Sequence, residues 1–583
     1  MVGRFFFVFP IILALFGLIA LGFSTLGHSV VLDHLNDAAL DGSVDSYSAG
    51  LHGQIQGNLR IAALLLGILA LSIFLMRAQL TVWFAGEGGI TRFTAEVRKL
   101  KHDYTKRTSR GHKQMVLLIV MVGVILRCIM LIQPLTYDEA FTYTYFATRP
   151  IHIILSDYSY PNNHVLNTLL VKLFTAVLGV GKISLRLPAF VAAVACLPLF
   201  YLFVRHMFNR YIALVALAFV ASSPRIIEYS ALGRGYAITW LCMVIALLLG
   251  RRFAKENDLV SAMLIAVVCA IGMWAVPTMV YPALMIYLWL IFYILNKYKD
   301  SRAERVWNWL GSVLVFVFLS LLLYAPMLIV NGAVGYGRLS VTPDRTLEMF
   351  SVVSGDKALE IWAWFSDPGH FWISMLVCVG LVFAGFISVK YRLLMAAMFF
   401  GAVPLVVYQM DVPPPRVWVY TLFIFHLSSA IALYYLLKLF HDNGMKVLTE
   451  RRRAVLTSFA VLIGFGVTGM DHLLGDKSRS GDAAFSAKKI SASVVSEDRI
   501  ITQYPWEAPV EFEAMANGVD RRVFYNPIPE NGSVYVVVGT KEGQTLPSVL
   551  AHNGVFQNEL PLFEVVDDTN GLKTFVARIE QSK

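Results

Sequence analysis

The sequence has little charge for its length. Only 15% of its 583 residues are Asp, Glu, Lys or Arg, whereas 57% are hydrophobic, and the mean hydropathy is +0.63. Ordinary soluble domains carry about 25% charged residues. The composition therefore excludes an ordinary soluble protein and predicts an α-helical polytopic membrane protein.

Acidic residues are fewer than basic ones, and the formal net charge is +10. Such an excess is also typical of nucleic-acid binding, but here the basic residues gather in short segments between apolar runs. This distribution is the one that the positive-inside rule predicts. We therefore expect membrane lipids, and no nucleic acid, around these residues.

Cysteine is scarce, and no metal-ligand spacing occurs. Small apolar core side chains are a better interpretation of the cysteines than disulfides or metal ligands, because all five lie in apolar stretches. They are Cys128, Cys196, Cys242, Cys269 and Cys378. The sequence requires no metal or other cofactor, although Asp138, Glu139 and His164 are residue types that can share a divalent ion.

The N-terminal part sets the orientation. The apolar run Phe5–Phe23 lacks a small-residue cleavage site, which predicts a retained anchor. Residues 33–52 are acidic and contain no Lys or Arg, so we place them outside, and Ile61–Met76 returns the chain. Residues 77–113 are strongly basic and therefore cytoplasmic. The N-terminus is then also cytoplasmic.

Given that orientation, Gln114–Ile132 crosses outward, so that Asp138 and Glu139 emerge at the outer face. The stretch His164–Val180 is apolar at helical spacing but contains Asn167 and Lys172, which predicts an interfacial helix on the outer surface. With about 13 spans in all, every later basic cluster lies inside. The later spans are predicted at Leu187–Met207, Tyr211–Ser222, Ala237–Gly250, Ser261–Ala275, Tyr281–Leu295, Val306–Val330, Phe371–Val389, Leu393–Tyr408, Val417–Leu437 and Val455–Met470. Residues 331–370 are predicted to form a long outer loop.

The composition changes after residue 470 to that of a soluble module. Alternation in Ser533–Val538 and Thr574–Arg578 predicts strands. We expect three parts: residues 1–113 with two extra spans and the basic segment, residues 114–470 as the membrane domain, and residues 471–583 as a small extracytoplasmic α/β domain.

Two adjacent carboxylates, Asp138 and Glu139, follow a span within an aromatic segment. Carboxylates at a membrane surface are costly unless they have partners or a function. One interpretation is structural, since Thr136 and Glu139 fit a helix-capping box. The other is catalytic, with Asp138 as a general base.

Four stretches resemble, in order and spacing, the bacterial GT-C glycosyltransferases, a group that includes protein O-mannosyltransferases and the lipid A aminoarabinose transferase. The stretches are Leu126–Pro150 with its acidic pair, Ser184-Leu185-Arg186-Leu187-Pro188, Ser223-Pro224 with Tyr229-Ser230 and Arg234-Gly235-Tyr236, and Pro415-Arg416 with Tyr420. Two places depart from the family pattern: Pro161-Asn162-Asn163-His164 stands where His-Pro-Pro is common, and Ala231-Leu232-Gly233 stands where many members have Glu.

The resemblance implies an inverting, polyprenyl-phosphate-sugar-dependent glycosyltransferase (a hexosyl or pentosyl transferase). It would move a sugar to a hydroxyl of a cell-envelope glycan, lipid or protein at the outer face of the bacterial plasma membrane. Asp138 would be the catalytic base, because a carboxylate can accept the proton of a poorly nucleophilic hydroxyl. Glu139 would support it.

The leaving phosphate would need cations where its charge develops. The resemblance assigns donor phosphate or sugar contacts to Arg186, His164 and two Arg/Tyr pairs. These pairs are Arg234 with Tyr236 and Arg416 with Tyr420. Structural alternatives stay open: interfacial arginines that reach lipid headgroups, belt tyrosines, a cap made by Arg186 and a structural His164.

Two other functions compete with the enzyme. A transporter or flippase of lipid-linked saccharides would show ionisable groups near the membrane midplane in repeated halves. Here the charged residues of the candidate site gather in one outer pocket, and the sequence shows no repeat. A non-catalytic relative would not need Asp138, Arg234 and Arg416 together.

Overall fold

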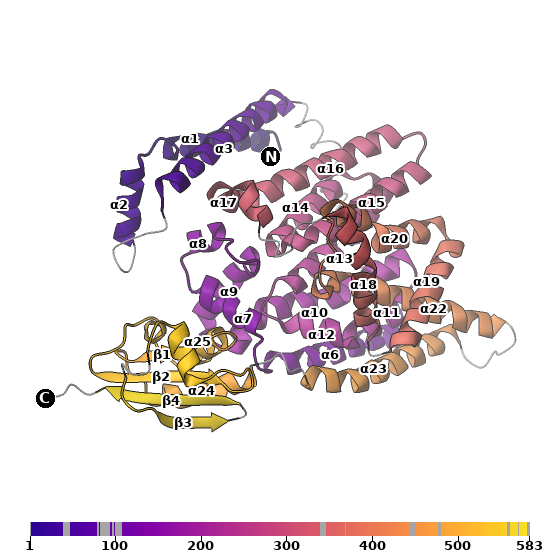
Figure 1. Ribbon diagram of the computed structural model, residues 1–583. Helices are drawn as coiled ribbons and strands as arrows, with labels where there is room; N and C mark the ends of the chain where they lie inside the picture. The colour runs from indigo at the N-terminus through magenta and orange to yellow at the C-terminus, as the bar shows by residue number, and fades with distance from the viewer. Residues whose placement is uncertain are drawn as a thin grey trace.

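The computed structural model describes residues 2–38, 47–78, 81, 94–95, 98, 108–338, 346–367, 369–442, 449–475, 480–556, 560–569 and 571–579. Within them the chain is mostly helical, with a small sheet near the C-terminus (Figure 1). The predicted fold class is therefore confirmed.

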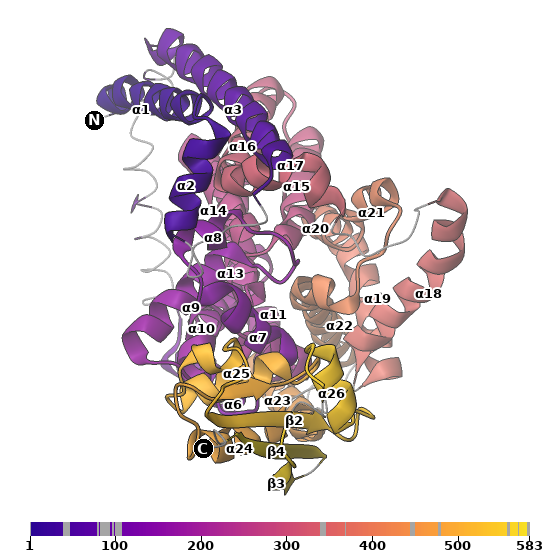
Figure 2. The same cartoon turned by 60° about the vertical axis from the view of Figure 1, so that its left-hand side comes forward.

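The N-terminal helices lie at the edge of the molecule. They are α1 (Val2–Phe23), α2 (His28–Ala38) and α3 (Ala49–Leu75). Helices α1 and α3 pack along each other, and both views place α3 beside α17 (Figures 1 and 2). The side-chain amide of Asn58 donates to the carbonyl of Ile329 at 2.9 Å, which ties α3 to the main bundle.

The main bundle carries all the helices between residues 110 and 474. They are α6 (Arg110–Leu131), α7 (Tyr137–Phe141), the π-helix η2 (Thr142–Ala147), α8 (Ile151–Ser156), α9 (Val165–Leu178), α10 (Lys182–Met207), α11 (Arg210–Ser222), α12 (Pro224–Ala231), α13 (Tyr236–Glu256), α14 (Leu259–Ala275), η3 (Pro277–Met279), α15 (Val280–Lys297), α16 (Arg302–Leu323), α17 (Ala325–Arg338), α18 (Leu347–Ser366), α19 (His370–Ile387), α20 (Val389–Phe400), α21 (Val403–Gln409), the 3₁₀-helix η4 (Pro415–Thr421), α22 (Leu422–Asp442) and α23 (Glu450–Leu474).

Among the described residues, nine helices are long and apolar enough to cross a membrane, or up to eleven if each bent helix pair is one span. This is fewer than the 13 predicted. Helix α11 counts as a span only together with α12, from which it is bent by 60°. Helix α14 has 17 residues, fewer than the roughly 20 of a straight span. The predicted loop over residues 331–370 is also corrected, because α17 and α18 occupy much of it.

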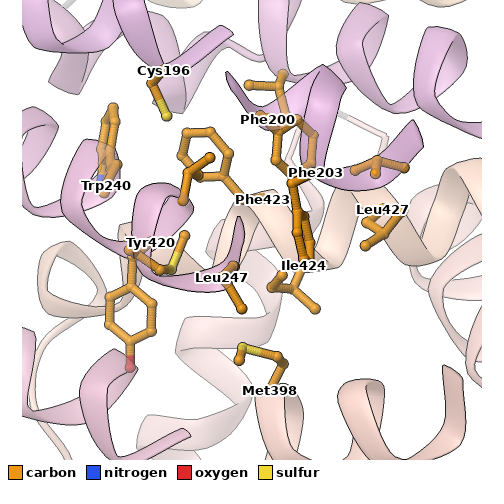
Figure 3. Close-up of a cluster of buried hydrophobic side chains, with 14 of the residues drawn as sticks. Cys196, Phe200, Phe203, Trp240, Leu247, Met398, Tyr420, Phe423, Ile424 and Leu427 are labelled. Carbon is orange, nitrogen blue, oxygen red and sulfur yellow. The ribbon is translucent and has the colours of Figure 1, made fainter. Parts of the chain in front are cut away.

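The core surrounds α11, which is buried along nearly its whole length. A helix that is apolar on all sides belongs in the interior of a bundle. Figure 3 shows part of this core, where the ring of Phe423 of α22 packs against Phe200 of α10 and Trp240 of α13.

The cysteine prediction is correct in part. Cys196, Cys242 and Cys269 are buried, whereas Cys128 and Cys378 are exposed on their helices and are not core residues.

The C-terminal module contains a four-stranded sheet in the order β1-β2-β4-β3. Its elements are α24 (Gly481–Ser491), β1 (Arg499–Ile501), α25 (Glu507–Ala516), η5 (Arg521–Phe524), β2 (Gly532–Gly539), α26 (Leu546–His552), β3 (Glu564–Thr569) and β4 (Leu572–Ile579). Strand β1 pairs parallel to β2, and the other pairs are antiparallel, with Val536 opposite Phe575. Both strands predicted from alternation, within β2 and β4, are confirmed.

The C-terminal module packs on the acidic segment of the bundle. Ala508 and Phe512 of α25 join a buried cluster with Ala140 and Tyr143, and Lys182 forms a 3.0 Å ion pair with Glu513. The two parts are thus in direct contact at α7 and η2 (Figure 2).

Candidate functional site

The two adjacent acids point to different environments. Glu139 is fully buried, and its carboxylate pairs with Arg186 through two hydrogen bonds, from Nε at 2.7 Å and from Nη2 at 2.8 Å. It also accepts from the backbone N–H of Thr136 at 3.0 Å and of Gly233 at 2.8 Å. Burial alone would raise the pKa of Glu139, but the charge and hydrogen bonds of Arg186 outweigh it and hold the pKa below its ordinary value.

The remaining N–H groups of Arg186 donate hydrogen bonds to carbonyls at the end of α6. Its Nη1 donates to the carbonyls of Met130 at 2.8 Å and Gln133 at 2.7 Å, and Nη2 donates to that of Pro134 at 3.0 Å. The last carbonyls of a helix have no partner within the helix, so Arg186 caps α6. Since its side chain is only 1% exposed, the structure does not bring Arg186 to the open side of the site.

Glu139 likewise caps α7, where the predicted capping box with Thr136 is present. The Glu139–Arg186 pair therefore joins the end of one helix to the start of the next. This buried pair is structural, and it stands directly beside Asp138 in the sequence.

Asp138 is the open member of the acidic pair. Its side chain is 36% exposed and forms an ion pair with Arg234, which is 6% exposed. The amide of Asn162 lies between them, with Nδ2 at 3.4 Å from Asp138 Oδ1 and Oδ1 at 3.2 Å from Arg234 Nη2. Three segments far apart in sequence, α7, the turn before α9 and the loop before α13, therefore meet at one carboxylate.

The neighbours of His164 determine which ring nitrogen carries its proton. The backbone N–H of Gly235 donates to Nδ1 at 3.2 Å, and a backbone N–H can only donate. Burial, followed by the charges of Arg234 and Arg416, holds the pKa of His164 well below its ordinary value, so the ring is neutral with its proton on Nε2. This Nε2–H and Arg234 Nη2, 3.4 Å apart, are both donors. An anionic oxygen placed between them would accept a hydrogen bond from each.

Arg416 adds a cation from η4. Its side chain is exposed, and its charge acts on His164 and Tyr229. With the residues that the structure describes, Arg416 forms no ion pair. Its place beyond three prolines stiffens the backbone that holds it.

The two predicted tyrosines are both buried. Tyr236 lies beneath Arg234, with the guanidinium carbon 5.5 Å from its ring centre, and meets His164 edge to face. Tyr420 is 3% exposed, and its hydroxyl has no hydrogen-bond partner among the described residues. In Figure 3 this hydroxyl points away from the labelled core. An unpartnered buried hydroxyl costs about 1–3 kcal/mol, which favours a ligand contact there.

An apolar cavity of about 450 Å³ lies beside η4. Its walls come from α15, α18, α20, α21, η4 and α22, and include Trp362, Phe365, Trp418 and Phe425. A cavity of this kind accepts hydrocarbon rather than a sugar.

The three residues considered for a divalent ion are divided between two environments. Glu139 is committed to Arg186, whereas Asp138 and His164 both lie beside Arg234. Among the described residues, no three His, Cys, Asp or Glu side chains are grouped as a metal site requires.

Asn162 is the site residue that sequence reasoning missed. Its signal was the departure Asn162-Asn163-His164, a polar run in a short turn between two apolar helices. Near the site, Arg127 donates to the carbonyls of Ala221 and Val220, both at 3.0 Å, and Arg225 pairs with Glu228 at 3.5 Å.

Comparison with known proteins bears on this arrangement. The family model of dolichyl-phosphate-mannose-protein mannosyltransferases matches residues 165–325, a range that includes Arg186 and Arg234. A comparison with curated proteins finds no match.

Two solved structures have the same architecture. ArnT from Cupriavidus metallidurans in the apo state has a TM-score of 0.52 at 11% identity, covering 80% of this chain and 98% of that chain. The same protein bound to undecaprenyl phosphate has a TM-score of 0.51 at 12% identity, covering 79% and 97%. This chain has the GT-C fold. The predicted resemblance to GT-C glycosyltransferases is thereby confirmed, whereas the roles of individual GT-C site residues stay predictions.

Proposed function

We propose that the protein is an inverting glycosyltransferase that moves a sugar from a polyprenyl-phosphate donor to a hydroxyl acceptor at the outer face of the bacterial plasma membrane. The observation that carries the proposal is the cluster of Asp138, Arg234 and His164, which combines a half-exposed carboxylate with N–H donors directed at one place. The family match and the GT-C fold support the same reaction class.

The donor phosphate would lie against Arg234 and the Nε2–H of His164, with Arg416 as the outer cation. Charge-assisted hydrogen bonds from guanidinium groups suit a phosphate, and cations placed where negative charge develops lower the barrier. The apolar cavity beside η4 would take the first isoprene units of the lipid. ArnT, which shares the fold, has been solved with undecaprenyl phosphate bound.

Asp138 would act as the base once the phosphate is bound. In the structure its carboxylate is paired with Arg234, and a phosphate that engages Arg234 would compete with this pair. The released carboxylate then accepts the proton of the acceptor hydroxyl as the hydroxyl oxygen attacks the anomeric carbon. The bond from that carbon to the phosphate oxygen breaks in the same step, which inverts the anomeric centre.

The test compares the wild type with Asp138→Asn, both purified in detergent and supplied with polyprenyl-phosphate sugars and candidate acceptors. The Asn variant keeps shape and hydrogen bonding but lacks the base, so we expect transfer to fall by about 10²- to 10⁴-fold. Donor binding, measured by retention of labelled donor, should persist. Full transfer by Asp138→Asn would refute the assignment of the base, and wild-type protein that neither binds nor turns over any donor would refute the proposed reaction.

A further inference from the structure

An aromatic patch continues from the candidate base toward the C-terminal domain. Tyr137, Phe141 and Tyr145 are spaced by four residues, and their rings form a stack with centres 5.8 Å and 5.0 Å apart. The last of the three lies in the π-helix η2. π-Helical turns are rare and occur frequently at functional sites.

Two further tyrosines stand edge-on to this stack. Tyr160 meets Phe141 and Tyr145 at ring distances of 5.2 Å and interplanar angles above 80°. Tyr504, from the C-terminal domain, meets Tyr137 at 5.0 Å and 75°. Tyr160 is 48% exposed and Tyr504 is 66% exposed. We call these five residues the aromatic platform: Tyr137, Phe141, Tyr145, Tyr160 and Tyr504.

Two residues of the aromatic platform, Tyr137 and Tyr160, lie close in sequence to Asp138 or to a residue that contacts it. Tyr137 directly precedes Asp138, and its hydroxyl donates to Glu507 of α25 at 2.5 Å. Tyr160 begins the turn whose Asn162 contacts Asp138. The charge of Asp138 also acts on the hydroxyl of Tyr137, so a ligand on the platform would lie near the carboxylate.

The chemistry of the platform selects the ligand. A pyranose presents a face of C–H groups that carry partial positive charge, and an aromatic face is negative. Tyrosine adds a hydroxyl for the sugar hydroxyls and loses little entropy on binding, since it has two rotatable side-chain bonds. The stacked rings cover one another, and Arg149 lies 3.9 Å from the centre of the Tyr145 ring. The exposed groups are therefore the rings and phenol hydroxyls of Tyr160 and Tyr504, whereas an extended peptide would be recognised through backbone hydrogen bonds.

We propose that the aromatic platform binds pyranose rings of a carbohydrate acceptor and thereby directs one of their hydroxyls to Asp138. The proposal rests on the proposed function and narrows its acceptor to a saccharide, borne either by a soluble glycan or by a glycolipid. The C-terminal domain contributes Tyr504 and so forms part of the acceptor site.

The test measures saccharide binding to the full chain in detergent, because binding does not depend on turnover. Titration calorimetry would use soluble hexasaccharides of glucose, mannose and N-acetylglucosamine, digalactosyl diacylglycerol as the glycolipid, and a Ser/Thr-rich peptide. The variants are Tyr160→Ala, Tyr504→Ala, the corresponding Phe variants and Phe485→Ala. Phe485 is a matched control, since it is 47% exposed on α24 of the same domain.

We expect each platform Ala variant to weaken saccharide binding by about tenfold, in line with the strength of aromatic contacts. The Phe variants should retain most of the affinity, and Phe485→Ala should match the wild type. A stronger signal with the hexasaccharides or with the glycolipid identifies the source of the sugar, and either supports the proposal.

Three results would overturn the proposal: no saccharide binds the wild type, the Ala variants bind as the wild type does, or the peptide binds and loses affinity in the Ala variants. Saccharide binding that depends on the platform in a protein that transfers no sugar would leave the platform intact and refute the proposed function instead. Sugar transfer with an unchanged acceptor KM in the Ala variants would support the proposed function and refute the role of the platform.

Discussion

Glu139–Arg186 and Asp138–Arg234 are two ion pairs on consecutive acids of one short helix. In the first pair both side chains are at most 1% exposed, and the arginine fills its donors with the carboxylate and the carbonyls at the end of α6. In the second pair the carboxylate is 36% exposed, and its arginine also donates to Asn162 and lies 3.4 Å from His164 Nε2. Burial and complete hydrogen bonding make the first pair structural, while the half-open second pair leaves room for a substrate.

The comparison shows that two adjacent acids can have different roles, one structural and one open to substrate. Breaking a buried pair leaves an uncompensated charge, so the closed pair is expected to govern stability. The open pair is expected to govern the reaction. Each prediction below either separates these two roles or refutes the separation.

The largest effect is expected from Arg186→Ala. It leaves Glu139 buried without its cation and the end of α6 without its cap, so we expect a loss of about 3–5 kcal/mol of stability. Thermal unfolding in detergent measures it. Lys357→Ala is the control, since Lys357 forms a partly exposed pair with Asp411, and such pairs contribute about 0–1 kcal/mol. Equal losses in the two variants would contradict a structural role for the closed pair.

Arg234→Lys tests the open pair. Lysine keeps the charge but loses the planar fork that matches a carboxylate or phosphate, so we expect kcat/KM for the donor to fall about 10- to 100-fold. The melting temperature should change far less than in Arg186→Ala. Arg252→Lys, at an ion pair with Asp258, controls for the substitution itself. A loss of stability as large as that of Arg186→Ala would mean that both pairs are structural.

Asn162→Ala removes the amide that bridges Asp138 and Arg234. One polar contact of this kind contributes about 0.5–1.5 kcal/mol, so we expect transfer to fall by several-fold with stability preserved. Asn163→Ala is the matched control in the same turn. Asn163 is fully buried and donates to the carbonyls of Ile154 at 2.8 Å and Asp157 at 2.7 Å, so its variant should lose stability. The opposite assignment of the two effects would contradict the geometry.

The smallest effect concerns the contact between α25 and the acidic segment. Burial raises the pKa of Glu507, although the hydrogen bond from Tyr137 opposes it. A carboxyl whose pKa is higher in the folded protein stabilises the fold below its unfolded pKa, and this contribution is lost as the pH rises through the folded pKa.

Glu507→Gln does not titrate. We therefore expect its melting temperature to rise relative to that of the wild type as the pH increases from 5 to 8. Parallel melting curves across that range would show that Glu507 titrates normally.

Much of the architecture followed from local patterns. Apolar runs predicted most of the membrane helices, and alternation predicted β2 and β4, because burial in lipid or in a sheet imposes a period on each segment separately. Residues 331–370 mix polar and apolar residues without a clear period, so a loop was predicted there. The structure instead has helices α17 and α18 over much of this range.

The sequence by itself determined the fold class, the capping box of Thr136 and Glu139 and the set of charged residues near the outer ends of helices, since each depends on neighbouring residues or on composition. Only the tertiary structure decided which carboxylate is open, which arginine serves which acid, and that Asn162 and Tyr504 reach the acidic segment. Those contacts join residues that are 24 to 367 positions apart. Partners at such separations are set by the packing of whole helices and of the C-terminal domain, and no local pattern encodes them.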